Sequence, residues 1–196
     1  MQIKERTKNS FADALIQMLE TMPLEKVRVT ALCKRCGTVP ATFYYYFRDK
    51  YDLVSWIYLQ DISAGPEDGP PDFSPGSLAV VNERLHKRKT FYQKAFSDQS
   101  QNSLREYMQA TMIQGARDVY KSVTGEEIPR RELVEVKYYV LGIIELFRDW
   151  LFDGGTELED IGYMVVAKKP ELLQTLFERF SQALGPAPQA PEKPAS

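Results

Sequence analysis

The strongest constraint on the fold is a pair of short amphipathic segments on either side of Gly37. The first, VTALCKRC, covers residues 29–36, and the second covers residues 39–47 and begins with Val-Pro. A glycine at this place favours a left-handed cap that ends the first helix. Proline suits the first turn of the second helix, where its missing N–H costs nothing. Two short helices joined by such a turn form a helix-turn-helix.

Five consecutive aromatic residues, FYYYF at 43–47, lie in the second helix of this motif. Helical spacing divides the block into two groups. One group is predicted to pack on Leu32 and on the helix before it, and it consists of Val39, Phe43 and Phe47 with Tyr46 at the edge. Tyr44 and Tyr45 point away from that group. We predict that these two tyrosines face DNA, where a hydroxyl can donate to phosphate and a ring can contact sugar or a thymine methyl.

Helical periodicity extends over almost the whole chain, and no run alternates apolar and polar residues, so the predicted fold class is all-α. An amphipathic helix over residues 10–22 precedes the motif, and Asp49 is placed to cap a fourth helix from residue 50. Further helical segments are expected at 77–96, 103–123, 130–152, 157–169 and 170–184. Within the first of them, the run HKRK at 86–89 is expected to be a solvated bend rather than a second DNA-binding patch.

A proline- and glycine-rich stretch interrupts the chain after the fourth helix. Residues 64–76 contain four prolines and three glycines, which predicts a linker. The tail after residue 184 has no apolar periodicity, which predicts disorder. The expected domains are therefore a helix-turn-helix domain at 1–63, the linker at 64–76, a helical regulatory and dimerisation domain at 77–184 and the disordered proline-rich tail at 185–196.

Charge is divided unevenly along the sequence. Residues 1–50 hold nine lysines and arginines against five acidic residues, whereas residues 51–196 hold sixteen against twenty-two. A basic N-terminal region suits contact with nucleic-acid phosphates. No uncharged apolar run approaches the roughly 20 residues of a membrane span. We therefore expect a cytoplasmic protein with no membrane partner.

Cys33 and Cys36 form a C-x-x-C pair that invites zinc or redox chemistry. A zinc site needs two more ligands, and the chain has no other cysteine and one histidine, His86. We predict that both cysteines are buried packing residues and that no metal is bound. No nucleophile is spaced to pair with His86, and no phosphate-binding glycine loop is present. The expected protein is not an enzyme and has neither catalytic residues nor a cofactor.

The segment from 130 to 154 is apolar around more of its circumference than one core face requires. Broad apolarity indicates burial on two sides, so this helix and residues 170–184 are expected to form a four-helix homodimer interface. A central core helix in a monomer is the other interpretation. The residues expected at the interface are Val140, Ile144, Phe147, Leu173, Phe177 and Phe180.

The run RVTALCKRCGTVPATFYYYFRDKYDL resembles the DNA-binding signature of the TetR family of bacterial transcription regulators. The typical order is kept at Gly37, Thr42, Phe43, Tyr44, Tyr46, Phe47, Lys50 and Leu53. The resemblance covers roughly residues 7–58. The remainder of the chain is similar to the C-terminal domain of relatives of activators of dihydroxyacetone kinase operons, in which a long helix ends with a tryptophan, here Trp150, and Gly-Gly.

This resemblance implies a set of DNA-contacting residues, namely Arg28, Thr30, Pro40, Ala41, Thr42, Tyr44, Tyr45 and Lys50. Lys50 also stands at a helix N-terminus, which adds to its attraction for a phosphate. The sequence departs from the family at Arg28, where a capping serine or threonine is usual. It departs again at Val39-Pro40, where the family commonly has serine followed by lysine, arginine or glycine. We expect recognition to depend more on DNA shape and on Tyr45.

By the same resemblance, we expect a homodimeric repressor that binds a palindromic operator in double-stranded DNA under the control of a small molecule or partner protein. An effector pocket is expected by analogy, and its candidate lining residues, which could equally be core, are Tyr92, Tyr107, Met108, Met112, Tyr138 and Tyr139. The alternative is a protein-interaction module with a vestigial helix-turn-helix, acting as a co-regulator through its C-terminal domain.

Overall fold

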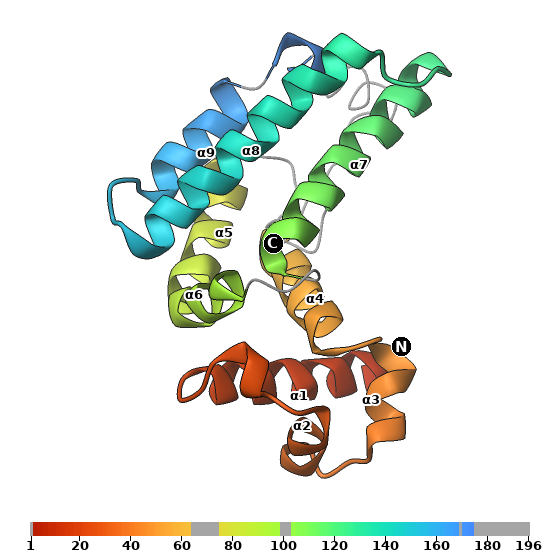
Figure 1. Ribbon diagram of the computed structural model, residues 1–196, viewed down its shortest axis with the longest axis vertical. Coiled ribbons are helices and arrows are strands. Elements are labelled where there is room, and N and C mark those ends of the chain that lie inside the picture. Colours follow the sequence, from red (N-terminus) through yellow and green to blue (C-terminus); the bar gives the residue numbers. More distant parts are fainter. Residues whose placement is uncertain (1, 64–74, 99–102, 169, 175–196) are drawn as a thin grey trace, which may run out of the picture.

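The computed structural model describes residues 2–63, 75–98, 103–168 and 170–174. Every regular element in these ranges is helical, which confirms the all-α prediction (Figure 1). The elements are α1 (Gln2–Leu19), the 3-10 helix η1 (Leu24–Lys26), α2 (Val29–Arg35), α3 (Pro40–Tyr46), α4 (Lys50–Ile62), α5 (Pro75–Lys87), α6 (Lys89–Ser97), α7 (Leu104–Thr124), α8 (Arg130–Phe152) and α9 (Leu158–Ala167). No helix in the described ranges is long and apolar enough to cross a membrane.

Helices α1, α2 and α3 form a small domain at one end of the molecule, and α4 leads from it to the larger helical domain (Figure 1). The small domain is organised around Phe11 of α1, which is fully buried. Its ring meets Phe43 edge to face at a centroid distance of 5.2 Å and Phe47 at 6.5 Å. Phe47 in turn lies 5.9 Å from the ring of Trp56 in α4. This aromatic cluster orients α3 on α1 and attaches α4 to both.

The predicted helix ends of this domain are confirmed. Gly37 has a φ of 62°, a left-handed conformation that favours glycine and ends α2. Pro40 is the first helical residue of α3. The carboxylate of Asp49 accepts hydrogen bonds of 2.8 Å from the backbone N–H groups of Tyr51 and Asp52, so it caps α4.

The larger domain is built around the long helices α7 and α8, with α9 beside α8 and α5 packed on both α4 and α9. The bend expected at the run HKRK is confirmed, because the chain turns at Arg88 between α5 and α6. Helix α6 then packs against α1, which joins the two domains at a second place besides α4. Helix α5 starts at Pro75, within the expected linker. Residues 64–74 and the tail at 185–196 lie outside the described residues.

A buried carboxylate explains the turn at Arg88. Asp61, near the end of α4, is 2% exposed. One of its oxygens accepts a hydrogen bond of 2.5 Å from the Arg88 guanidinium, and the other accepts one of 2.5 Å from the Tyr92 hydroxyl. Burial, together with the neighbouring Asp61 carboxylate, raises the pKa of Tyr92, which keeps this hydroxyl a donor. The ion pair therefore ties the end of α4 to the corner between α5 and α6.

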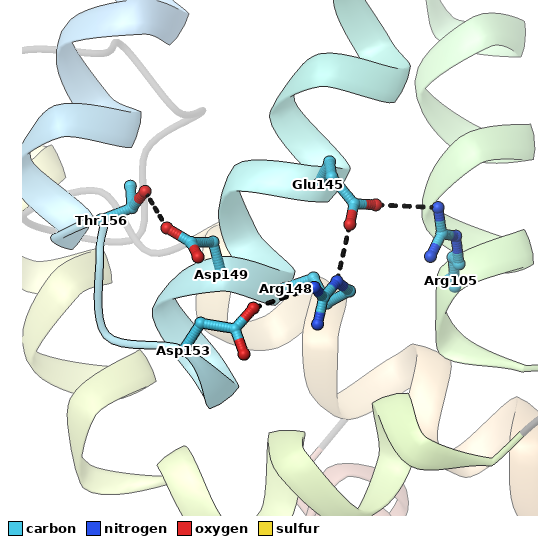
Figure 2. A network of polar contacts seen from close by, with 6 residues as sticks. All are labelled: Arg105, Glu145, Arg148, Asp149, Asp153 and Thr156. Atoms are coloured by element: carbon cyan, nitrogen blue, oxygen red, sulfur yellow. Dashed lines mark hydrogen bonds and ion pairs between the residues drawn. The ribbon is translucent and has the colours of Figure 1, made fainter.

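Ion pairs on the surface of the larger domain connect α7 to α8 (Figure 2). Glu145 of α8 accepts from Arg148 at 2.6 Å and from Arg105 of α7 at 3.0 Å. Arg148 also reaches Asp153, at 2.9 Å, just beyond the end of α8. These side chains are largely exposed, so each pair contributes little to stability. Their effect is to fix the solvent-facing side of α8 relative to α7.

The Gly-Gly pair after α8 has a steric explanation. Gly154 has a φ of 70°, and its N–H donates to the carbonyl of Asp149 at 2.9 Å. The carboxylate of Asp149 accepts a hydrogen bond of 2.5 Å from the Thr156 hydroxyl (Figure 2). A Cβ atom at Gly155 would lie 3.1 Å from that carboxylate. The pair therefore lets the chain reverse tightly into α9.

The ion pair of Asp61 gives a stability prediction. Replacing Asp61 with alanine should lower the free energy of unfolding by about 2–4 kcal/mol, because Arg88 and Tyr92 would lose a buried acceptor. Denaturant titration followed by circular dichroism measures the change. Glu83→Ala is the control, since it breaks an exposed pair with Lys87 near the same corner and should leave stability unchanged. Equal stability of wild type and Asp61→Ala would contradict a stabilising role for the pair.

Candidate nucleic-acid interface

The outer face of α3 carries most of the residues predicted to contact DNA. Tyr45 is 68% exposed, and Tyr44, Pro40 and Ala41 are also exposed. Thr42 is partly buried. The first turn of α3 presents small side chains, so its backbone can approach a DNA groove closely. The two longer tyrosine side chains extend further from the helix. The arrangement suits the second helix of a helix-turn-helix, whose leading residues meet base edges.

The two exposed tyrosine rings are supported by neighbours in the same block. Tyr44 packs edge to face on buried Phe43 with centroids 5.5 Å apart. Tyr45 packs in the same way on half-buried Tyr46 at 4.9 Å. As predicted, Phe43 and Phe47 are buried and Tyr46 lies at their edge. The supporting rings restrict the orientation of both exposed rings.

The predicted packing of Val39 is wrong, because its side chain is 60% exposed. Val39 is the residue before the first helical residue of α3, and its φ of -114° and ψ of 157° are extended. The helical spacing that relates it to Phe43 therefore does not apply to its side chain. Val39 instead adds an apolar side chain to the exposed surface at the start of α3.

Lys50 has protein acceptors in this structure. Its ammonium donates to the carbonyl oxygens of Leu24 at 2.7 Å, Glu25 at 3.0 Å and Val27 at 3.3 Å. Partial burial lowers the pKa of Lys50, and the three carbonyls replace water lost on burial. Lys50 thus fastens the start of α4 to the turn before α2. The contact of Lys50 with a DNA phosphate stays a prediction. The ammonium that would make this contact already has three carbonyl partners.

Arg28 and Thr30 lie exposed at the start of α2. Arg28 occupies the N-cap position and makes no capping hydrogen bond with its side chain, as the sequence predicts. Its guanidinium is exposed and has no hydrogen-bond or ion-pair partner among the described residues, so it is available to a phosphate. The structure also places Lys4 near this surface, with its ammonium 5.9 Å from the centroid of the Tyr45 ring. The sequence reasoning missed Lys4 because it began the first helix at residue 10, although helical residues continue back to Gln2.

The cysteines fit the packing prediction. Cys33 is buried, and the thiol of half-buried Cys36 donates to the carbonyl of Ser10 at 3.4 Å. Burial raises the pKa of both thiols, which disfavours the reactive thiolate. Within the described residues, no three His, Cys, Asp or Glu side chains are grouped to hold a metal. His86 is exposed, with its ring 5.4 Å from that of Trp150.

The residues predicted at the homodimer interface do not form an exposed surface. Val140, Ile144 and Phe147 are buried within a single chain, because the neighbouring helices of the larger domain already cover that face of α8. Leu173 is buried too, whereas Phe177 and Phe180 lie outside the described residues. Assigning these α8 residues to an intermolecular contact is therefore wrong. The exposed apolar side chains of α8 are Val134, Tyr138, Leu141 and Phe152.

The predicted pocket residues separate into four places. Met108, Met112 and Tyr139 line a cavity of about 410 Å³ in the larger domain. Tyr92 is bound to Asp61, and Tyr107 lines a separate cleft of about 310 Å³ beside Arg48. Tyr138 lies outside, 82% exposed. Sequence reasoning missed most of the lining because cavity and core positions have the same apolar periodicity.

The contacts of Lys50 predict a stability effect that DNA binding alone would not produce. Lys50→Met should lower the free energy of unfolding by about 1–2 kcal/mol, because three carbonyls lose a charged donor. Thermal unfolding in the absence of DNA measures it. Lys26→Met is the control, since Lys26 is exposed in the same turn and should not change the melting temperature. Identical melting of the two variants would contradict the positioning role.

Comparison with known proteins agrees with this geometry. The family model described as "Bacterial regulatory proteins, tetR family" matches residues 12–56, from α1 into α4. The solved structure of a "Dihydroxyacetone kinase operon activator DhaS" is similar over 88% of this chain and 97% of its own, with a TM-score of 0.55 and 18% identity. That likeness shows a shared fold. No curated protein matches the chain. The chain therefore carries the N-terminal helix-turn-helix domain of the TetR family, whose members are DNA-binding transcription regulators and not enzymes.

Proposed function

We propose that this regulator is a homodimeric repressor, acting in the cytoplasm on a palindromic operator and controlled by an effector bound in its larger domain. The observation that carries the proposal is the exposed face of α3, where two supported tyrosines follow a turn of small residues. In the major groove, Tyr45 and Tyr44 would contact bases, sugars or phosphates. Arg28 and Lys4 would contact phosphates on either side.

An exposed apolar stripe on α8 supports the homodimer. Val134, Tyr138 and Leu141 are spaced four and three residues apart, so they share one face of the helix. Tyr163 and Val166 of α9, beside α8, are exposed as well. Apolar groups gathered on a surface mark interaction sites. We propose that α8 and α9 of two copies pack about a twofold axis, with their α3 helices one turn of DNA, about 34 Å, apart.

Control by an effector is proposed to act through α4. Its first residue, Lys50, is bound to the turn before α2, and its later residue Asp61 is bound to Arg88. Tyr58 and Ile62 of the same helix line the cavity. An effector that prefers one position of α4 would change the population of DNA-competent dimers. We propose that the protein represses transcription, and a reporter gene tests this point separately. Higher transcription in the presence of the protein would make it an activator and would leave the proposed DNA contact unaffected.

The DNA-binding proposal predicts that duplexes selected from a random pool share one partly palindromic motif. On that motif, Tyr45→Ala should weaken binding by about 10-fold or more, since a specific side-chain contact in the groove is worth about 1–3 kcal/mol. Arg28→Ala should reduce the salt slope by about one. Fluorescence anisotropy at several salt concentrations gives both quantities.

Lys121→Ala is the control for these variants, because Lys121 is an exposed cation at the far end of α7 and should not alter binding. Melting temperatures of all variants exclude misfolding. A selection that enriches no motif would contradict the proposal and favour the alternative, a vestigial reader in a protein-interaction module.

The dimer proposal predicts that Leu141→Glu converts the dimer to a monomer, because two introduced carboxylates would be buried near the twofold axis. Sedimentation equilibrium measures the mass. Glu135→Lys is the matched control, since Glu135 is exposed on the same helix but outside the apolar stripe. A Leu141→Glu protein that remains dimeric would exclude this face as the interface.

A further inference from the structure

The cavity of the larger domain is enclosed by parts of five helices, and its wall is almost entirely apolar. Leu78 and Val81 come from α5, Met112 from α7, Ile143 from α8 and Val165 from α9. Tyr58 and Ile62 complete the wall from α4. A volume of about 410 Å³ is within the range of small-molecule sites. An apolar cavity holds water poorly, because a water molecule needs two to four polar partners.

The wall also constrains the charge of a ligand. Among the described residues that line the cavity there is no Asp, Glu, Lys, Arg or His. The nearby Arg88 and Asp61 are paired with each other and are not part of the wall. A charged ligand would therefore lose its water without gaining a counter-charge, at a cost of several kcal/mol. A neutral ligand avoids this cost.

The polar atoms of the wall limit the ligand further. The Tyr139 hydroxyl donates to the carbonyl of Met164 at 3.2 Å, and the amide of Asn82 donates to Glu159 at 3.5 Å. Ser77 also has a partner. The Tyr58 hydroxyl has no hydrogen-bond partner among the described residues, although Tyr58 is only 7% exposed. Among the hydroxyls of the cavity wall, that of Tyr58 is therefore the one left able to donate to a ligand.

We infer that the cavity binds a neutral, predominantly apolar small molecule whose single hydrogen-bond acceptor meets the hydroxyl of Tyr58. Burial raises the pKa of Tyr58, so the phenol stays neutral and able to donate. A polyhydroxylated molecule is excluded as a tight ligand, because most of its hydroxyls would lack partners in this wall. The inference rests on the proposed function only in its claim that the ligand changes DNA binding. Binding of the ligand to the cavity does not require DNA.

The first test uses two fluorescent probes that differ in charge. N-phenyl-1-naphthylamine is neutral, and 8-anilinonaphthalene-1-sulfonate has the same rings with one sulfonate. The neutral probe should bind once per chain, and the sulfonate should bind at least about 10-fold more weakly because its charge would be buried unpaired. Ala116→Phe should abolish binding of the neutral probe, since Ala116 lines the cavity and phenylalanine would fill part of it.

The exposed stripe of α8 could bind such probes as well, so Tyr138→Ser is the control outside the cavity and should leave their affinity unchanged. Circular dichroism confirms that each variant is folded. Equal affinity for both probes, or unchanged binding in a folded Ala116→Phe protein, would overturn the inference. Met112→Trp fills the same cavity from another position if Ala116→Phe does not fold.

The second test isolates the Tyr58 hydroxyl. Benzophenone and diphenylmethane differ by one carbonyl oxygen, and each is titrated as a competitor of the bound neutral probe. Tyr58→Phe should weaken benzophenone about 5-fold, the effect of one net hydrogen bond, and should leave diphenylmethane unchanged. Tyr120→Phe is the matched control, a half-buried tyrosine of α7 that does not line the cavity. Equal effects of Tyr58→Phe on both competitors would refute the predicted contact.

A third measurement separates this inference from the proposed function. Dihydroxyacetone, the ketone that gives the similar activator its name, represents a small polar ligand and should not displace the neutral probe. Displacement by dihydroxyacetone at concentrations comparable to benzophenone would contradict the apolar assignment. Operator affinity is then measured with and without benzophenone. If the probe binds but benzophenone leaves operator affinity unchanged, the proposed control through α4 is overturned. The inferred class of ligand would still hold.

Discussion

The buried ion pair between Asp61 and Arg88 is the contact on which the arrangement of the two domains depends. Helix α4 belongs to both domains, and a helix without fixed ends would transmit little from one to the other. Lys50 attaches its first turn to the carbonyls before α2, and Asp61 attaches its last turn to the corner before α6. Both attachments use a charge surrounded by hydrogen-bond partners, which makes their geometry specific. The orientation of α3 is therefore linked to the position of the larger domain.

The same helix connects the cavity to the DNA-binding surface. Tyr58 lines the cavity one turn before Asp61, so the proposed ligand contact and the ion pair would act on the same end of α4. The contrast between the two regions is electrostatic. The DNA-binding end has exposed cations such as Arg28 and Lys4, whereas the cavity wall has no charged side chain among its described residues. The two regions therefore suit partners of different charge, a polyanionic DNA at one end and the proposed neutral ligand in the cavity.

Much of the small domain could be predicted from the sequence, because its helix ends are decided by near neighbours. The left-handed turn at Gly37, the leading Pro40 and the cap at Asp49 each depend on a few adjacent residues. Val39 was mispredicted because helical spacing was applied one residue before the helix begins. Lys50 is different again, since its nearest acceptor, the carbonyl of Leu24, lies 26 residues earlier and no local pattern reveals it.

The sequence by itself determined that the chain is helical, that its N-terminal part is a helix-turn-helix of the TetR family and that the aromatic block divides into buried and exposed rings. Only the tertiary structure decided that Val140 and Ile144 are core, that Leu141 is exposed and that Tyr58 lines a neutral cavity. The physical reason is that periodicity shows which side of a helix is apolar but not what covers it. Whether an apolar face becomes core, cavity wall or interface depends on how helices far apart in the sequence pack together.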